Sequence, residues 1–246
     1  MLANLELHIE RDPDDLAKRA TLVTWQALRA TKDQFLIALS GGSTPRRYHQ
    51  QMAQLDREET PWGKVVVLFS DERAVRPDHP DSNYRMARET LLDVAPIALS
   101  KIHRIPAEEP DLDRVALEYE ALIKELSKGS GAVDLVVLGM GNDGHTASLF
   151  PGHPLPPPGR LVVATPVSPT TPLTPRVTFT YEAIALAKRV LLLVAGGDKA
   201  SRLEEILEQR GELPLQRALA GRTGPTTVVA DLAAAKNILA RRRSES

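Results

Sequence analysis

Short apolar runs separated by longer amphipathic segments define the pattern of this chain. The runs are rich in valine, leucine and isoleucine and are bounded by turn residues, as strands usually are. Several are apolar throughout, which is typical of parallel strands that are covered on both faces. They occupy residues 35–40, 65–70, 134–140, 161–167, 176–180, 190–196 and 226–231, with a weaker candidate in "LELHI" near the start.

Helical spacing fills the segments between these runs. Asp12 is expected to cap a first helix that has Pro13 at its first position, and Gly129 is expected to end another helix. Thr44 is expected to cap a helix that Pro45 begins. Further helical segments are predicted within residues 198–211 and 231–243.

This alternation predicts an α/β fold with an open, doubly wound, mostly parallel sheet and helices on both faces. Such sheets bind ligands beyond the carboxyl ends of their strands. Residues 151–175 contain nine of the 19 prolines, but a predicted strand lies in their middle. We therefore interpret the flanks as stiff loops around a site, within a single domain over residues 1–246.

Composition narrows the possible functions. The chain is 42% hydrophobic and 26% charged, with 31 basic and 32 acidic residues and a net charge of −1. This balance indicates neither nucleic acid nor an anionic membrane as a partner. The absence of cysteine excludes disulfides and thiolate nucleophiles. The N-terminus is charged too early for a signal peptide, and the apolar runs are too short to span a bilayer, so we expect a cytoplasmic protein. We also expect a monomer or small homo-oligomer.

Two of the predicted strands are followed by residues that suggest a site. Gly41, Gly42 and Ser43 form a glycine-serine loop before a helix, a common anion site, although an ordinary strand-to-helix turn fits equally well. Asp71 and Arg73 follow the next strand, where a solvated charged loop is the alternative.

The most informative stretch is "LGMGNDGHTASLFPG", residues 138–152. Its G-x-G-x-x-G pattern suggests a dinucleotide site, but no acidic residue follows Asp143 until Glu182, so the ribose-binding carboxylate is missing. A P-loop would need a lysine where His145 stands. A metal site lacks a convincing third ligand, although His153 is a candidate. The stretch therefore predicts a histidine held among glycines beside an aspartate. Two later cations, Arg176 and Lys199, are candidates for binding an anion.

Taken together, these motifs resemble the 6-phosphogluconolactonases, which belong to the glucosamine-6-phosphate deaminase and isomerase superfamily. The resemblance spans roughly residues 35–205 through "SGGSTP", "SDER" followed by Ser82 and Asn83, "GMGNDGHTASLFPG", "PRVTFT" and "GGDKA". It implies a Rossmann-like fold, no cofactor, no metal and a sugar-phosphate ligand. It also implies a catalytic base at His145, with Asp71, Arg73 and Asp143 around it. The substrate-binding positions that it implies are Ser40, Gly41, Gly42, Ser43, Gly141, Gly144, Arg176 and Lys199.

The activity implied by this resemblance is hydrolysis of 6-phospho-D-glucono-1,5-lactone to 6-phosphogluconate in the pentose phosphate pathway. Two alternatives stay open, an amino-sugar-phosphate deaminase or isomerase and a sugar-phosphate sensor without turnover. In the deaminase relatives a glutamate helps to open the sugar ring, and here Phe150 stands in its place. Glu72 is the residue that could replace that glutamate from the facing loop.

Overall fold

Six parallel strands form the central sheet of the computed structural model, which describes residues 4–170, 172–209 and 211–244. The weak candidate near the start of the chain is an edge strand of this sheet. The strand order confirms the predicted open, doubly wound architecture. From one edge to the other, the strands are β1 (Leu5–Glu10), β9 (Thr226–Asp231), β8 (Val190–Val194), β5 (Leu135–Gly139), β2 (Phe35–Leu39) and β3 (Val65–Phe69).

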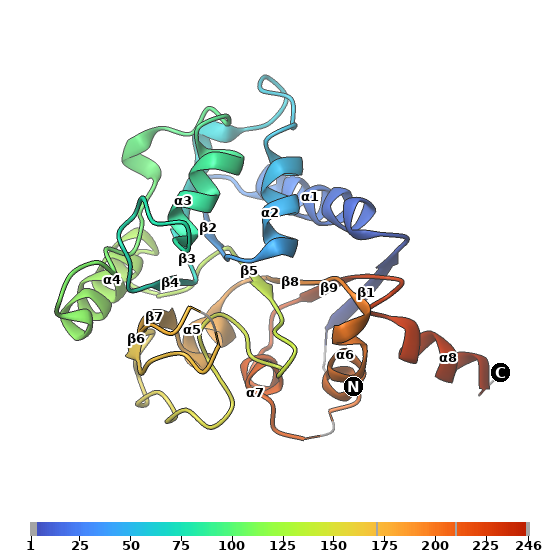
Figure 1. Ribbon diagram of the computed structural model, residues 1–246. Helices are drawn as coiled ribbons and strands as arrows, with labels where there is room; N and C mark the ends of the chain where they lie inside the picture. The colour runs from blue at the N-terminus through green and yellow to red at the C-terminus, as the bar shows by residue number, and fades with distance from the viewer. Residues whose placement is uncertain (1–3, 171, 210, 245–246) are drawn as a thin grey trace.

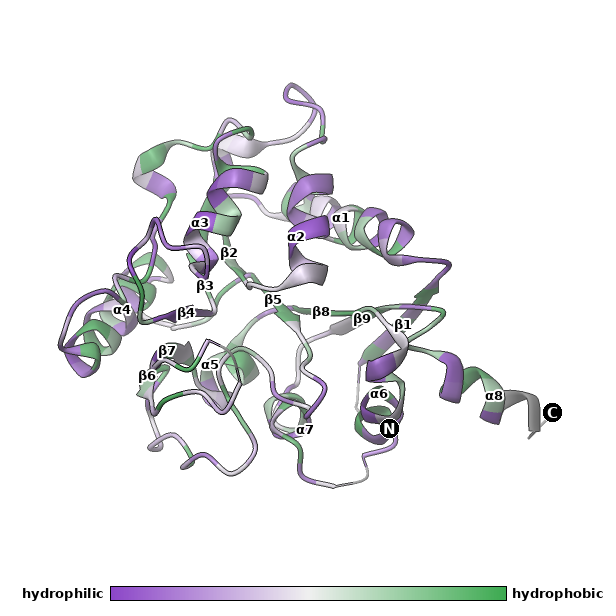
Figure 2. Ribbon diagram, in the orientation of Figure 1, coloured by the Kyte–Doolittle hydropathy of each residue, from purple (hydrophilic) through white to green (hydrophobic). Residues whose placement is uncertain are grey.

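Helices cover both faces of this sheet, as predicted (Figure 1). On one side lie α1 (Pro13–Ala30) and α2 (Ser43–Met52), and on the other lie α5 (Tyr181–Leu186), α6 (Ala200–Leu207) and α7 (Pro214–Ala220). Figure 2 shows the inner strands as hydrophobic and the helices as mixed, in keeping with amphipathic helices that cover an apolar sheet. The remaining helices are α3 (Asn83–Ala87), α4 (Leu112–Leu126) and α8 (Lys236–Ser244), with shorter helical turns η1 (Trp62–Lys64), η2 (Arg88–Leu92), η3 (Leu99–Lys101) and η4 (Gly197–Lys199).

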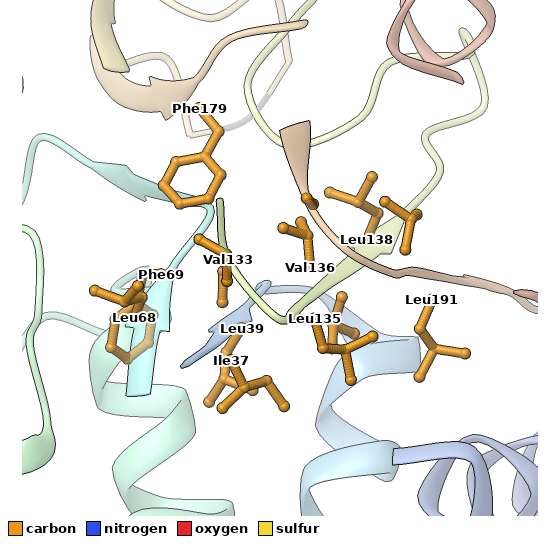
Figure 3. Packing of buried hydrophobic residues seen from close by; sticks show 14 of the residues in the cluster. Ile37, Leu39, Leu68, Phe69, Val133, Leu135, Val136, Leu138, Phe179 and Leu191 are labelled. Atoms are coloured by element: carbon orange, nitrogen blue, oxygen red, sulfur yellow. The ribbon is translucent and has the colours of Figure 1, made fainter. Parts of the chain in front are cut away.

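The core is built on strands that are buried along their whole length. Every residue of β2, β3 and β8 is buried, which explains why these runs are apolar rather than alternating. Ile37 of β2 is the register partner of Leu135 of β5, and Figure 3 shows their side chains close together in the core. Each such side chain stabilises the fold by roughly 1.5–3 kcal/mol.

Two predicted strands lie outside the parallel sheet. β6 (Val162–Thr165) and β7 (Arg176–Phe179) pair antiparallel and form a second sheet with β4 (Asp71–Arg73), in the order β4-β7-β6. A parallel pair needs a crossover of roughly a dozen residues or more, and the connection from Thr165 to Arg176 is shorter, so this pair is antiparallel. The segment Asp71–Arg73 was expected in a loop, but its pairing with β7 makes it a short strand.

Helix boundaries agree with the prediction at Asp12 but not at Thr44. The Asp12 carboxylate accepts hydrogen bonds from the first backbone N–H groups of α1, and Pro13 opens the helix. By contrast α2 begins at Ser43, and Gly42 occupies the capping position with φ of 106°. Glycine adopts this backbone conformation readily, so the chain enters the helix earlier than Thr44 would allow.

The later helices are also shorter than expected. α4 ends at Leu126. Gly129 follows with φ of 88°, and its N–H donates a hydrogen bond to the carbonyl of Lys124. α8 begins only at Lys236, because residues 232–235 form a turn after β9. Arg210, within the segment 198–211, lies outside the described residues. Within the described ranges, no helix combines the length and the apolar character needed to cross a membrane.

Candidate active site

The winding of the sheet places a cavity between β2 and β5. After β2 the chain adds β3 on one side, and it then returns to add β5 on the other side, so the loops that follow β2 and β5 diverge. A cavity of about 300 Å³ lies where they separate. Of the predicted site residues, it is lined by Ser40, Gly41, Gly42, Ser43, Asp71, Arg73, Gly141, His145, Arg176 and Lys199, leaving out only Asp143 and Gly144.

His145 and Asp143 form the central pair of this site. The Nδ1 atom of His145 lies 2.6 Å from Oδ1 of Asp143, which also accepts the backbone N–H of His145 at 3.1 Å. Burial raises the pKa of the Asp143 carboxyl, but these hydrogen bonds outweigh burial and hold its pKa below the ordinary value. Asp143 is therefore charged at neutral pH. Because Nδ1 is occupied, Nε2 is the ring nitrogen left for a ligand in the cavity.

The glycines of this loop have distinct roles. A side chain at Gly141 would place its Cβ 2.1 Å from Nδ1 of His145, so only glycine lets the imidazole fold back over the loop. The N–H of Gly141 donates to the carbonyl of His145, and the N–H of Gly144 donates to the carbonyl of Gly141. Gly144 has φ of 82° and packs against Leu213, outside the cavity lining. These two N–H groups are therefore already used within the loop.

Pairing of β4 with β7 brings two guanidinium groups together. Arg73 and Arg176 are direct register partners, and both line the cavity. The Nε atoms of both are buried without a hydrogen-bond partner among the described residues. Burial lowers the pKa of Arg176, Asp71 opposes this, and Arg73 lowers it further by repulsion. Arg176 is buried and Arg73 is partly buried, and these like charges destabilise each other, so an anion bound between or beside them is favoured.

The amino end of α2 and Lys199 add to this positive character. Gly42 provides no side-chain cap, so the first N–H groups of α2 are left for a ligand at the cavity wall. Lys199 belongs to η4, and its Nζ lies 3.0 Å from Oδ2 of Asp198. The side chain of Lys199 is 20% exposed. The cavity thus combines a helix amino end with three cationic side chains, an arrangement suited to a phosphate.

Asn83 is a lining residue that was not predicted as part of the site. Its Nδ2 donates to the carbonyl of Asp71 at 2.9 Å and lies 3.2 Å from the Asp71 carboxylate. A Cβ at position 41 would lie 1.7 Å from Oδ1 of Asn83, so the close approach of the Asn83 side chain requires glycine there. The Ser82–Asn83 pair after "SDER" was the sequence signal that pointed here.

Asp71 also ties the histidine loop to the second sheet. Its Oδ2 accepts a hydrogen bond of 2.7 Å from the hydroxyl of Ser148, and both residues are buried. Ser148 in turn donates its backbone N–H to Thr178 of β7. The loop that carries His145 is therefore fixed to the strands that carry Arg73 and Arg176.

Glu72 does not take part in the cavity. Its carboxylate accepts the backbone N–H groups of Arg73, Asn83 and Tyr84 at 2.8 Å each and the hydroxyl of Ser82 at 2.9 Å. Burial nevertheless raises its pKa above the ordinary value. Glu72 anchors the loop before α3 and is not available as a replacement for the ring-opening glutamate.

The proline-rich segment surrounds the site less closely than expected. None of its described residues, 151–170 and 172–175, lines the cavity. Its contribution is indirect, because the carbonyl of Pro172 accepts a hydrogen bond from Arg176 at 3.2 Å. His153 of this segment packs against Phe150. Over the described ranges, no group of three or more histidine, aspartate or glutamate side chains is arranged to hold a metal ion.

Comparison with known proteins identifies close counterparts of this architecture. Residues 11–228 match the family described as glucosamine-6-phosphate isomerases/6-phosphogluconolactonase. The chain is 39% identical to a 6-phosphogluconolactonase of Synechocystis over 84% of its own length and 83% of the relative. It is 38% identical to the corresponding Nostoc protein over 78% and 80%. Its fold superposes on 6-phosphogluconolactonase from Trypanosoma cruzi with a TM-score of 0.85 and 30% identity, covering 97% and 98% of the two chains.

Proposed function

Because the chain belongs to the family of glucosamine-6-phosphate isomerases and 6-phosphogluconolactonases, we propose that it hydrolyses 6-phospho-D-glucono-1,5-lactone to 6-phosphogluconate. This is the ester-hydrolysis step that opens the lactone in the pentose phosphate pathway. The observation that carries the proposal is that His145, paired with Asp143 behind it, lines the same cavity as Arg73, Arg176 and Lys199. The cavity thus combines a base that can deprotonate water with cations that can bind a phosphate.

His145 acts as the general base. Water attacks C1 of the lactone while Nε2 of His145 takes its proton, a transfer that imidazole performs well at neutral pH. Asp143 fixes Nδ1 as the protonated nitrogen and stabilises the imidazolium that forms, because its carboxylate is already charged. The tetrahedral adduct then collapses, the bond between C1 and the ring oxygen breaks, and the imidazolium returns its proton to that oxygen. The product is the open-chain acid with a free hydroxyl at C5.

Charge on the carbonyl oxygen needs separate donors. The N–H groups of Gly141 and Gly144 are occupied within the loop, so they do not serve this purpose. Arg73 and the amino end of α2 remain as donors that line the cavity. Arg176 and Lys199 bind the phosphate, and this remote binding holds C1 in place before the water.

The alternative functions are less well supported by this site. Phe150 cannot exchange a proton, and Glu72 is fully engaged in hydrogen bonds away from the cavity. A deaminase would therefore lack its ring-opening acid. A sensor without turnover has no need for a carboxylate-oriented base. We include in the proposal a cytoplasmic location, no nucleic-acid partner, and a monomer or small homo-oligomer.

The proposal is tested by following acid release from freshly prepared 6-phosphogluconolactone against its spontaneous hydrolysis. Glucosamine 6-phosphate is incubated in parallel and ammonia is measured. We expect rapid lactone opening and no enzymatic ammonia. Ammonia release without acceleration of lactone opening reverses the assignment.

A further inference from the structure

The ring of Phe150 contacts both halves of the proposed machinery. The centroid of the Phe150 ring lies 4.4 Å from that of His145, with an angle of 41° between the planes. On the same ring, the Cζ atom of Arg176 lies 5.6 Å from the centroid. Phe150 is 2% exposed and does not line the cavity. It therefore lies behind the two side chains proposed to contact substrate.

Each of these side chains has few other restraints. The imidazole of His145 is held at Nδ1 by Asp143 and lies over the backbone of Gly141, and neither contact fixes the tilt of the ring on its other face. Contact with the Phe150 ring limits that tilt. The guanidinium of Arg176 has one hydrogen bond, from Nη2 to the carbonyl of Pro172, while its Nε has no partner among the described residues. The aromatic face is a second restraint for this cation.

We propose that Phe150 is a positioning residue that holds the base and the phosphate-binding guanidinium in fixed relative places. This rests on the proposed function. An apolar ring has a specific advantage here, because it restrains both groups without occupying Nε2 of His145 or the N–H groups of Arg176 that the substrate needs. A polar residue at this position would compete for those atoms. His153 packs against the same ring, with centroids 5.3 Å apart, and supports it from outside the cavity.

The test uses Phe150→Leu with Phe35→Leu as a matched control. Phe35 is 1% exposed and begins β2, at the end of the sheet opposite to the cavity. Both changes remove one buried ring from the core. With 6-phosphogluconolactone as substrate, we expect Phe150→Leu to lower kcat by about tenfold or more and to raise KM several-fold, because small displacements of catalytic groups are costly. Phe35→Leu is expected to leave both constants within about twofold, the size of a minor indirect effect.

A second measurement separates positioning from simple packing. The imidazole signals of His145, assigned by their loss in His145→Gln, are followed by NMR in each variant. We expect them to shift and broaden in Phe150→Leu and to stay unchanged in Phe35→Leu. If Phe150→Leu does not fold, Phe150→Met, which keeps a large flexible apolar side chain, takes its place.

The outcomes are distinct. Unchanged kcat, KM and His145 signals in the Phe150 variant, with a loss of Tm like that of Phe35→Leu, overturn the positioning role. If the unaltered protein does not accelerate lactone hydrolysis, the proposed function fails. The NMR comparison and titration with 6-phosphogluconate then still show whether Phe150 fixes His145 and Arg176.

Discussion

Replacing Asp143 by asparagine isolates the charge behind the proposed base. The side chain keeps its shape, so the hydrogen bond from the backbone N–H of His145 can persist. What disappears is the negative charge 2.6 Å from Nδ1 of His145. That charge matters most when His145 carries the proton taken from water, because only then does it face a full positive charge.

The size of the effect follows from the distance and the exposure of the pair. Two unit charges whose centres are roughly 4 Å apart interact by about 4 kcal/mol at an effective dielectric constant of ~20, and by about 1 kcal/mol in bulk water. The side chains of His145 and Asp143 are 25% and 36% exposed, so solvent reduces the larger value substantially. We take about 2 kcal/mol, which corresponds to a decrease in kcat of roughly 30-fold.

The assay is initial-rate acid release from 6-phosphogluconolactone, corrected for spontaneous hydrolysis. We expect Asp143→Asn to lower kcat by about 30-fold while KM changes by less than about threefold, since the missing interaction acts mainly in the transition state. Asp93→Asn removes an exposed aspartate paired with Arg88 and serves as the control for a change of net charge. A kcat for Asp143→Asn close to that of the control refutes the electrostatic role of Asp143.

Other substitutions test the remaining assignments. His145→Ala should lower kcat by about 10²–10⁴-fold and leave 6-phosphogluconate affinity similar, and near-normal turnover rules out His145 as the base. Arg176→Ala and Lys199→Ala should each weaken 6-phosphogluconate binding by ~1.5–3 kcal/mol in calorimetry while barely affecting turnover of unphosphorylated gluconolactone; normal binding in both places the phosphate elsewhere. Burial lowers the pKa of His49 to about 3, so the native state resists a proton that the unfolded chain accepts below about pH 6.5. Stability should therefore fall by up to ~1.4 kcal/mol per pH unit as pH drops from about 6.5 towards 3, and urea unfolding of His49→Leu should show a flatter pH dependence; identical slopes contradict this.

The strand positions were predictable because their signal is local. The runs that form β2, β3 and β8 are apolar throughout, and burial on both faces requires that composition wherever such a strand lies in the sheet. The order of the strands was not predictable in the same way, because it depends on which runs pair. The antiparallel pairing of β4 with β7 is the clearest example, since three charged residues carry no signal for a strand.

Local sequence also indicated the chemistry of the site. The glycine, aspartate and histidine spacing of residues 139–145 predicted a histidine held among glycines beside an aspartate, and the structure added that the imidazole folds back over Gly141. Phe150 was visible only as a residue that cannot act as an acid. Its place between His145 and Arg176 depends on packing of segments that are 26 residues apart along the chain at their nearest, and sequence spacing does not encode such distances.

The sequence by itself therefore determined the α/β pattern, because that pattern follows from short-range preferences, and its resemblance to a known family supplied the candidate base and most of the residues that line the cavity. The tertiary structure decided which of them meet. It placed Arg73 opposite Arg176, removed Glu72 and Gly144 from the cavity and added Asn83 to it. These outcomes depend on strand pairing and on competition for hydrogen bonds between distant segments, and both are settled only when the whole chain packs.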